Sequence, residues 1–370
     1  MTRERWAVEF SRTARAHWTE ARTLELTGGK QLAVVPGDAP VLLRALGLID
    51  RDATMPSSRV HKFLQINHLV RVIQPAIDEL CARHRVVRIL DAGCGRSYLS
   101  LLVAWCARER WHHRVEVLGV DRDAAVIEQC RRRCALAELD DVVEFRAANL
   151  DELARDATGC PTGEAGRVPS PGVLASLVDA TGGAASRPTG EAGRVPSPGL
   201  VDATGGAAPR PTGEAGRVRT PGLLASFVDR AHAVFALHAC DTATDDAIVL
   251  GVRFAAELIA VAPCCQAELA RGWSELASDG AFAPIWRAPH LRRETAAHLT
   301  DAMRMLVLRA SGYRVTATEF IAAEHTKKNT LIRATMSAAG PDHSARLEYD
   351  ALVAATGGVG LGLSARLGLG

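Results

Sequence analysis

Apolar and polar positions follow one another in blocks that predict strands separated by helices. Five apolar runs of four to six residues predict strands, at Val87–Leu90, Val115–Val120, Val142–Phe145, Ala233–Leu237 and Leu258–Ala262. Helical spacing of apolar residues follows over 98–108, 124–137 and 245–256. Strands that alternate with helices are typical of a parallel sheet covered on both faces.

The two ends of the chain extend this pattern. Residues 1–84 are expected to be mainly helical, with a strongly amphipathic run over Val60–Leu80, and to form a cap that is either a lid over a site or a helical decoration. Tyr313–Ile321 and Thr330–Met336 predict a closing antiparallel pair, which makes seven strands. Residues 340–370 are expected to form a helix and then, from Gly357, a flexible Gly-rich tail.

A repeat interrupts the expected domain of residues 85–339. The phrase Pro161-Thr-Gly-Glu-Ala-Gly-Arg-Val168 recurs from Pro188 and from Pro211, at spacings of 27 and 23 residues. The copies are rich in Pro, Gly, Thr and Ala and lack the apolar face that stacked repeats bury. We therefore expect residues 156–222 to be a disordered low-complexity insert between the third and fourth strands.

Composition narrows the class of protein. With 370 residues, of which 48% are hydrophobic, the chain can bury a full α/β core. The charged N-terminus resembles no signal peptide and no long uncharged apolar run is present, so a cytoplasmic protein without membrane contact is expected. A net charge of +2 gives no DNA signature, and the nine cysteines have no CxxC spacing, so no metal site is expected.

Candidate chemistry begins where the first strand ends, at Asp91-Ala-Gly-Cys-Gly95. Glycines allow a tight turn and a close approach of backbone to a ligand, and Asp121, at the end of the second strand, is suited to bind the two hydroxyls of a ribose. A dinucleotide-binding GxGxxG loop would need glycine where Tyr98 stands, and it does not require an acid before its first glycine. The acid at Asp91 suits the ammonium group of a methionine moiety instead.

These residues resemble the first motif of the class I methyltransferases that use S-adenosylmethionine (SAM), which is roughly (D/E)xGxGxG. Asp91, Gly93 and Gly95 match it, and Ser97 stands where a third glycine is usual. Serine suits that place if the backbone there does not need a positive φ. The resemblance implies a Rossmann-like, seven-stranded class I methyltransferase sheet with an N-terminal helical cap.

Three further segments resemble a group of bacterial methyltransferase-domain proteins related to the eukaryotic glutathione S-transferase C-terminal-domain-containing protein. They are Leu237-His-Ala-Cys-Asp-Thr-Ala-Thr-Asp245, Ala262-Pro-Cys-Cys-Gln266 and His325-Thr-Lys-Lys-Asn-Thr330. This resemblance runs from about Val60 to Met336 without the insert. The family implies SAM as the cofactor, bound by Asp91, Gly93, Cys94, Gly95, Asp121 and Asn149.

His238 and Asp241 follow the fourth strand, where class I enzymes usually place the methyl acceptor. We interpret them as catalytic candidates, against the alternative of a hydrogen-bonded histidine and a loop aspartate. Asn149 has the alternative of stabilising a turn. Thr242-Ala-Thr-Asp245 has the form of a capping box, which gives Asp245 a structural role.

Two other groups raise further alternatives. Cys264 and Cys265 are either small apolar residues or, as in some RNA C5-methyltransferases, the place of a nucleophilic thiol. Arg292, Arg293, Lys327 and Lys328 either contact phosphates or form a solvated surface.

The sequence thus predicts a methyltransferase that transfers the SAM methyl group to an N or O acceptor. RNA is the leading candidate for that acceptor, ahead of a protein side chain or a small metabolite. The alternatives are an NAD(P)-dependent Rossmann oxidoreductase and a catalytically inactive binding module.

Overall fold

One mixed sheet organises the chain. The computed structural model describes residues 2–156, 230–237, 239, 241–263, 266–276, 281–319 and 330–369. Seven strands in these ranges pair in the order β3-β2-β1-β4-β5-β7-β6. The strands are β1 (Val86–Ala92), β2 (Arg114–Asp121), β3 (Val143–Ala147), β4 (Ala233–Ala236), β5 (Leu258–Val261), β6 (Tyr313–Glu319) and β7 (Thr330–Met336).

The direction of the strands confirms the expected sheet. β1 pairs in parallel with β2 on one side and with β4 on the other, and β2 with β3 and β4 with β5 are parallel as well. β7 runs antiparallel to both β5 and β6, so the expected closing pair is present. The fold is therefore the Rossmann-like seven-stranded sheet that the sequence predicts, within ranges that differ by one to two residues at most strand ends.

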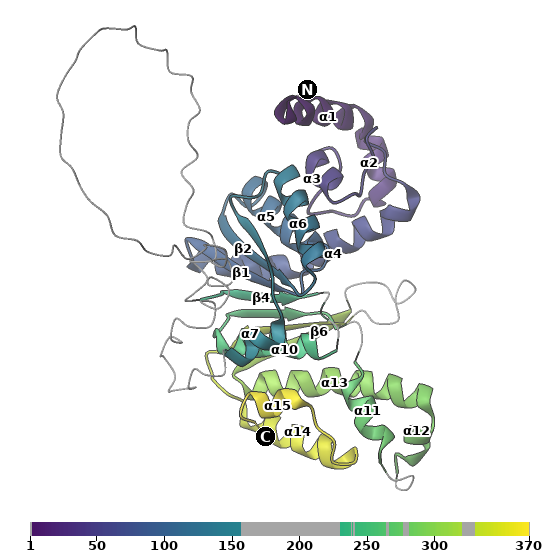
Figure 1. Cartoon of the computed structure of the whole chain (residues 1–370), viewed down its shortest axis with the longest axis vertical. Coiled ribbons are helices and arrows are strands. Elements are labelled where there is room, and N and C mark those ends of the chain that lie inside the picture. Colours follow the sequence, from purple (N-terminus) through teal and green to yellow (C-terminus); the bar gives the residue numbers. More distant parts are fainter. Residues whose placement is uncertain are drawn as a thin grey trace, which may run out of the picture.

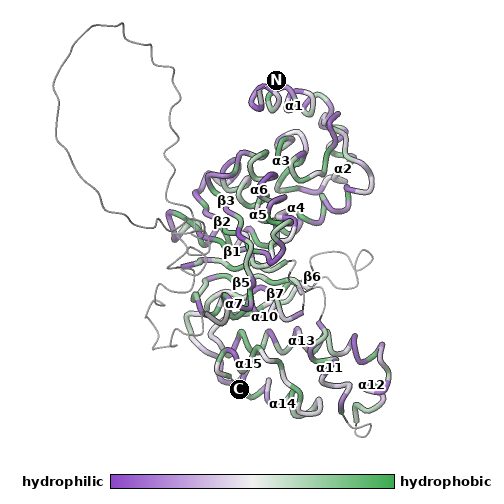
Figure 2. The backbone as a smooth tube through the Cα atoms, viewed as in Figure 1, coloured by the Kyte–Doolittle hydropathy of each residue, from purple (hydrophilic) through white to green (hydrophobic). Residues whose placement is uncertain are grey.

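The central strands are buried on both faces. Every residue of β4 and β5 is buried, which explains why each reads as an unbroken apolar run rather than an alternating one. Figure 2 shows the hydrophobic stretches of the chain gathered in the strands and on the inner sides of the helices. The side chains of β1 point alternately to the two faces of the sheet. Val87 and Ile89 pack into the core on one face, and Leu90 and Ala92 pack into the core on the other.

The N-terminal helices cover one face together with the first two crossover helices (Figure 1). Apolar residues of this group pack into one continuous core with the sheet. The helices are α1 (Arg3–His17), α2 (Glu20–Thr27), α3 (Pro40–Ala45), α4 (Ser57–Arg83), α5 (Tyr98–Glu109) and α6 (Ala124–Leu136).

The remaining helices lie on the opposite face of the sheet (Figure 1). α10 and α13 contribute most of the apolar side chains that pack against the sheet there. These helices are α7 (Leu150–Asp156), α10 (Thr242–Arg253), α11 (Glu268–Ser274), α12 (Ala283–Arg287), α13 (Pro289–Ala310), α14 (His343–Ala355) and α15 (Gly362–Arg366).

The capping box expected at Thr242 to Asp245 is wrong. α10 begins at Thr242, three residues earlier than expected, and Asp241 occupies the N-cap position without a side-chain capping bond. Asp245 therefore lies inside the helix, where its carboxylate pairs with the buried guanidinium of Arg304 at 2.7 Å. Its role is structural, as the sequence suggested, but through a tertiary ion pair that local spacing does not reveal.

The flexible tail expected from Gly357 is also wrong for the residues described, which end at Leu369. The chain turns at Gly357 and Gly358, which have φ of 94° and 79°, and then forms α15. Leu361 and Leu363 are 3% and 1% exposed, packed in the core between α10, α13 and α14. The high glycine content suggested flexibility, but the leucines between the glycines pack into the hydrophobic core.

The repeat of residues 156–222 lies outside the described residues except for Asp156. No helix in the described ranges is both long enough and apolar enough to cross a membrane.

Replacing Leu363 with Ala tests the packing of α15. Because the side chain is fully buried, we expect the free energy of unfolding to fall by about 2–3 kcal/mol, measured by urea denaturation. Leu347→Ala on α14 is the control, because Leu347 is 71% exposed and should change stability little. Equal stability of the two variants would show that the segment is loose in solution.

Candidate functional site

The loop between β1 and α5 forms the centre of the site. Gly93, Gly95 and Ser97 have φ of 72°, 50° and 58°, so three of five consecutive residues are in the left-handed region. The N–H groups of Gly93 and Cys94 donate to the carbonyl of Val120, at 2.8 and 2.9 Å. These bonds fold the loop over the end of β2.

Glycine at position 93 is required by a close approach as well as by its φ. A Cβ at this position would lie 3.3 Å from the Cβ of Ala239, in the segment that follows β4. That spacing is tighter than most side-chain contacts, so a larger residue would push the two loops apart. The sequence suggested a close approach of this backbone to a ligand, and the approach in the structure is between two loops of the protein itself.

Ser97 departs from the motif at a position that does favour glycine. Its φ of 58° contradicts the condition under which serine fits there without cost. A left-handed conformation costs an L-residue roughly 1–2 kcal/mol, which one residue in a well-packed loop can bear. Ser97 is fully buried as it leads into α5, so the packing around it holds the conformation.

Asp121 joins the first two loops. One of its oxygens, Oδ2, accepts from the N–H of Gly95 at 3.0 Å, and the other, Oδ1, accepts from the N–H of Asp123 at 3.1 Å. The carboxylate also lines a cleft. The acid at the end of β2 therefore fixes the loop after β1 in addition to facing the open space beside it.

The loops after β1, β2, β3 and β4 surround this cleft, whose volume is about 770 Å³. Asn149 lies in its wall and its Oδ1 accepts from the N–H of Asp151 at 3.2 Å, so it both stabilises the start of α7 and faces the cleft. The described lining residues are Gly93, Gly95, Arg96, Asp121, Arg122, Asp123, Val126, Ala148, Asn149, Leu150, Asp151, Ala239, Thr242, Ala243, Asp245, Asp246, Glu268, Gly362, Leu363 and Arg366.

Two residues expected at the cofactor lie beneath the cleft rather than in its wall. Asp91 is 3% exposed, and its carboxylate accepts a short hydrogen bond from the hydroxyl of Ser100 on α5. Burial raises the pKa of Asp91 to about 6, the charge of Asp121 adds to the rise, and the bond from Ser100 opposes it. Cys94 is buried as well, and a hydrogen bond to Cys130 together with burial raises the pKa of its thiol.

Asp241 also lies outside the wall of the cleft. Its Oδ1 accepts from the N–H of Ala267 at 2.8 Å, at the start of α11, and its Oδ2 pairs with Arg271 at 2.8 Å. Asp241 has φ of 52° and ψ of −123°, an unfavourable conformation that these bonds help to hold. The alternative interpretation, a loop aspartate with a structural role, fits this geometry.

His238, Cys264 and Cys265 lie outside the described residues, and so do Lys327 and Lys328. Leu237 and Ala239 lie at the end of β4, and Pro263 and Gln266 follow β5, so both segments emerge at the same edge of the sheet as the glycine loop.

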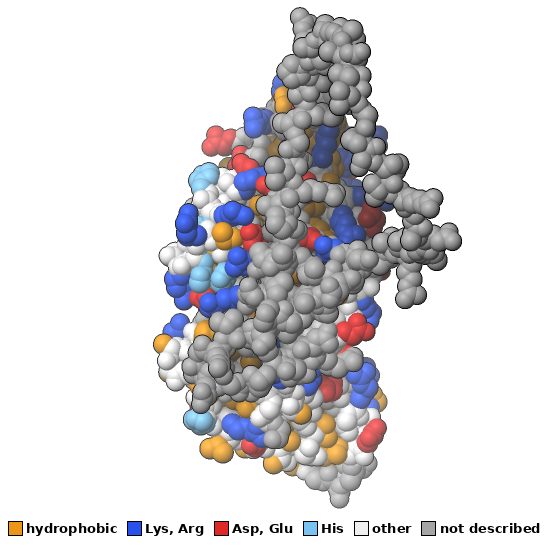
Figure 3. Space-filling model, turned by 60° about the vertical axis from the view of Figure 1, so that its left-hand side comes forward, with side chains coloured by type: hydrophobic (Ala, Val, Ile, Leu, Met, Phe, Trp, Pro, Cys, Tyr) orange, Lys and Arg blue, Asp and Glu red, His pale blue; other side chains and the backbone are white. Residues whose placement is uncertain are grey.

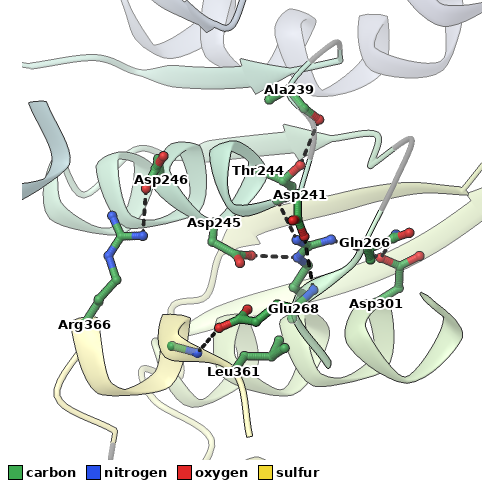
Figure 4. A network of polar contacts seen from close by, with 12 residues as sticks. Ala239, Asp241, Thr244, Asp245, Asp246, Gln266, Glu268, Asp301, Leu361 and Arg366 are labelled. Carbon is green, nitrogen blue, oxygen red and sulfur yellow. Dashed lines mark hydrogen bonds and ion pairs between the residues drawn. The ribbon is translucent and has the colours of Figure 1, made fainter. Parts of the chain in front are cut away.

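A polar network holds the segment after β4 in place (Figure 4). Arg304 on α13, only 1% exposed, donates to Asp245 Oδ1 at 2.7 Å and to the carbonyl of Asp241 at 3.0 Å. It also contacts Asp301, which accepts from Gln266 at 2.8 Å. Arg304 thereby ties the loops after β4 and β5 to α13.

The wall formed by the C-terminal segment was missed by the sequence interpretation. Arg366 on α15 pairs with Asp246 on α10 at 2.7 Å, and the N–H of Gly362 donates to Glu268 Oε1 at 2.9 Å (Figure 4). Burial raises the pKa of both Asp246 and Glu268, and these bonds oppose the rise. The Gly-rich composition of the segment concealed the short apolar pattern that packs it here.

Residues 1–84 contribute nothing to the described lining of the cleft. The helices that they form pack on the sheet face and against α5 and α6, so a lid over this cleft finds no support in the arrangement described. The C-terminal segment instead forms part of the wall, through Gly362, Leu363 and Arg366.

A parallel sheet with ligand-binding loops at its carboxyl edge defines the broad class, a Rossmann-like domain with a nucleotide-sized cleft. Residues 61–272 match the model of a family described as a methyltransferase domain. Because this match spans more than half of the chain, the protein belongs to that methyltransferase domain family. A search among curated proteins finds none that matches.

Several solved structures are similar to this chain at low identity. A putative O-methyltransferase from Klebsiella pneumoniae is 16% identical over 88% of this chain and 99% of its own, with a TM-score of 0.36. An O-methyltransferase from Bacillus cereus in complex with S-adenosylhomocysteine (SAH) is 13% identical over 87% and 100%, with a TM-score of 0.36. An SAH-bound methyltransferase from Podospora anserina is 10% identical over 86% and 97%, with a TM-score of 0.37.

Asp91→Asn tests the electrostatic state of the loop. The folded pKa of about 6 lies above the unfolded value of 3.8, so the contribution of Asp91 to stability is complete below pH 3.8 and is lost as the pH rises through 6. Asparagine is never charged, so we expect the variant to be more stable than the wild type by up to about 3 kcal/mol at neutral pH, with little difference near pH 4. Urea unfolding across this pH range measures the difference in free energy of unfolding between the variant and the wild type.

Ser100→Ala provides the matched comparison. Removing the hydroxyl that opposes the rise should move the pKa of Asp91 higher and steepen the loss of stability toward neutral pH. A gap between wild type and Asp91→Asn that stays constant with pH would contradict a raised pKa.

Proposed function

We propose that this methyltransferase uses SAM and transfers its methyl group to a nucleophilic N or O of the acceptor. The observation that carries the proposal is the convergence of the loops after β1, β2 and β3 on one cleft, with Gly93 in close contact with Ala239 and Gly95 bonded to Asp121. Glycine-rich backbone beside an acid at the end of the second strand is suited to a nucleoside with a free ribose.

Different residues of the cleft would bind different parts of the cofactor. Asp121 would accept the ribose hydroxyls, since each of its oxygens has one backbone donor and keeps a further lone pair. Ala148, Asn149 and Leu150 would border the adenine. Asp91 lies beneath the loop, so its contribution to a cationic cofactor would be the field of its charge rather than contact.

The bound cofactor supplies an electrophilic methyl group on a positively charged sulfur. Because direct displacement depends mainly on how donor and acceptor are positioned, the chain's main task is to hold the segment after β4 in one geometry. Asp241 would serve as a positioning residue through its bonds to α11 and the contact of Arg304 with its carbonyl. His238 stays the proposed residue closest to the acceptor, and Cys264 and Cys265 the rival nucleophiles.

The alternatives differ in what they bind. An NAD(P)-dependent oxidoreductase does not agree with the family match or with Tyr98 at the place of the third glycine in GxGxxG. A binding module without turnover would keep the cleft and the affinity for SAM. Titration with SAH and with NAD(P)H separates the first alternative, and a transfer assay separates the second.

Variants of the glycine loop should lose cofactor affinity. Gly95→Val places a side chain in the wall of the cleft at a φ of 50°, and Asp121→Ala removes both the proposed ribose acceptor and the bond to Gly95. We expect each to weaken SAH binding at least about tenfold, by isothermal titration calorimetry, for the loss of hydrogen bonds to a charged group. Asp78→Ala removes an exposed carboxylate on α4, outside the lining of the cleft, and controls for the loss of one negative charge. Wild-type affinity in both loop variants would refute the assigned cofactor site.

The proposed reaction is tested with tritiated SAM and RNA, protein and metabolite fractions from cells lacking the gene. We expect label to enter one fraction with the wild type and to be lost with Asp121→Ala. Tight SAH binding without label in any fraction would favour the binding module. Labelled RNA that stays covalently attached to the wild type but not to Cys264→Ser or Cys265→Ser would favour the thiol route.

A further inference from the structure

Two cationic side chains lie over the ring of Tyr98, the first residue of α5, and a third cationic residue, Arg96, precedes Tyr98 by two positions. Lys62, on α4, places its Nζ 5.1 Å from the ring centroid, and Arg133, on α6, places its guanidinium carbon 5.6 Å from it. The Nη1 of Arg133 donates to the carbonyl of Arg96 at 2.7 Å. Residues from two different helices and from the glycine loop therefore meet at one point.

The positive charge at this point is not balanced locally. Within the described part of the chain, no carboxylate forms an ion pair with Lys62, Arg96 or Arg133, and the polar contact of Lys62 is to Gln65 Oε1 at 3.4 Å. Burial lowers the pKa of Lys62, and the charge of Arg96 lowers it further. Like charges held together at partial burial carry an electrostatic cost that a bound anion would offset.

Many charged side chains elsewhere on the molecule have a neighbour of the opposite sign. Figure 3 shows Lys and Arg side chains interspersed with Asp and Glu on the face that it draws. Several described arginines form an ion pair with an acid, as Arg59 does with Asp50 and Arg309 with Asp342. Lys62 and Arg133 instead share one aromatic ring and form no such pair within the described residues.

The cluster lies beside the proposed site of transfer. Lys62, Gln65 and Tyr98 line a small hollow together with Leu237, the last described residue before position 238. Arg96 lines the cofactor cleft, as does Ala239. The hollow and the cleft are thus bordered by the same two segments, the glycine loop and the chain after β4.

The charges differ on the two sides of these segments. The far wall of the cleft carries Asp245, Asp246 and Glu268, and the arginines that reach the first two, Arg304 and Arg366, are engaged in those ion pairs. The hollow is lined by Lys62, with Arg133 on the same aromatic ring, and it lies at the N-terminus of a 12-residue helix, whose dipole adds positive potential. An acceptor with an anionic group would therefore enter from the side of α4 and α5.

We propose that Lys62, Arg96 and Arg133 form a binding site for a phosphate group of the methyl acceptor. The inference rests on the proposed function, because it takes the segment after β4 as the acceptor side. Planar guanidinium groups and a lysine ammonium together suit the several oxygens of a phosphate. The N-terminal helices would then contribute to the acceptor side through Lys62 on α4, rather than form a lid over the cofactor cleft. This chemistry agrees with an RNA acceptor, and a phosphorylated metabolite offers the same group.

The test compares Lys62→Gln with Lys62→Arg and with Arg293→Gln. Lys62 lies outside the cofactor cleft, and Arg293 is an exposed arginine on α13 that serves as the matched control. Binding of a short fluorescein-labelled single-stranded RNA is followed by fluorescence anisotropy at several salt concentrations. Each lost phosphate contact on a single strand should lower the slope of log affinity against log salt by about 0.7.

We expect Lys62→Gln to weaken RNA binding and lower the slope by about 0.7, Lys62→Arg to restore both, and Arg293→Gln to change neither. Arg133→Gln, with folding checked by thermal melting, should act in the same direction as Lys62→Gln. SAH affinity should be unchanged in Lys62→Gln. Competition by uridine monophosphate and by inorganic phosphate distinguishes the source: a Lys62-dependent site for the monophosphate without RNA affinity supports a phosphorylated metabolite.

Three results would overturn the site. One is RNA and monophosphate binding that does not depend on Lys62. Another is a slope that Arg293→Gln lowers as much as Lys62→Gln, which indicates diffuse attraction. The third is a loss of SAH affinity in Lys62→Gln, which would assign the anion to the cofactor's own carboxylate. Failure of wild-type protein to bind SAH would refute the proposed function separately, because the phosphate measurements do not use the cofactor.

Discussion

The close passage of the β1–α5 loop beneath the segment after β4 constrains the whole site. At Gly93 a Cβ would lie only 3.3 Å from the Cβ of Ala239, so a side chain there would push the two loops apart, and Gly95 is held by the acid that ends β2. β1 lies between β2 and β4 in the sheet, so its loop contacts the chain at the ends of both neighbours, Val120 on one side and Ala239 on the other. The cleft, the network on α13 and the cationic cluster on α4 are all arranged around this contact.

The buried ion pair of Arg304 holds the segment after β4 in one position relative to α10 and α13. Burying a guanidinium is costly unless every donor finds a partner, and here the partners come from α10, α13 and the backbone of Asp241. Such a group gives less net stability than its short distances suggest. It does make alternative packings of the chain after β4 unfavourable, because any displacement leaves a charge unpaired in the interior.

The parts of the fold that the sequence predicted are those set by local pattern. The parallel strands between Val86 and Val261 were visible as short apolar runs between helical segments. The antiparallel strand β7 has its expected bounds, Thr330 and Met336. The strands and helices needed only periodicity and chain order. The resemblance to class I methyltransferases indicated Asp121 and Asn149, and both line the cleft where parallel strands bring their carboxyl ends together.

The parts that escaped prediction depend on contacts between distant residues. Asp241 appeared catalytic because of its position after β4, but its carboxylate is used at the start of α11, 26 residues further along. Serine was expected to suit position 97 if the backbone needed no positive φ, and the sequence does not give that angle, which is 58°. The tail was judged by its glycines, and Lys62 had no local signal at all, since only the packing of α4 on α5 brings it to Tyr98.

The central position of β4 has a consequence for how quickly the chain folds. β4 pairs with β1 through Ile89 and Ala233, so the middle of the sheet is closed by residues far apart in sequence, with the repeat copies between them. The entropy of closing such a connection grows with the logarithm of its length, and each doubling costs only about 0.6 kcal/mol. Gain or loss of one copy would therefore alter the stability of the native state very little. The folding rate depends more strongly on sequence separation than the free energy of unfolding does. The number of repeat copies should therefore affect how fast the chain folds, and how long unpaired strand edges stay exposed during synthesis, more than it affects the stability of the native state.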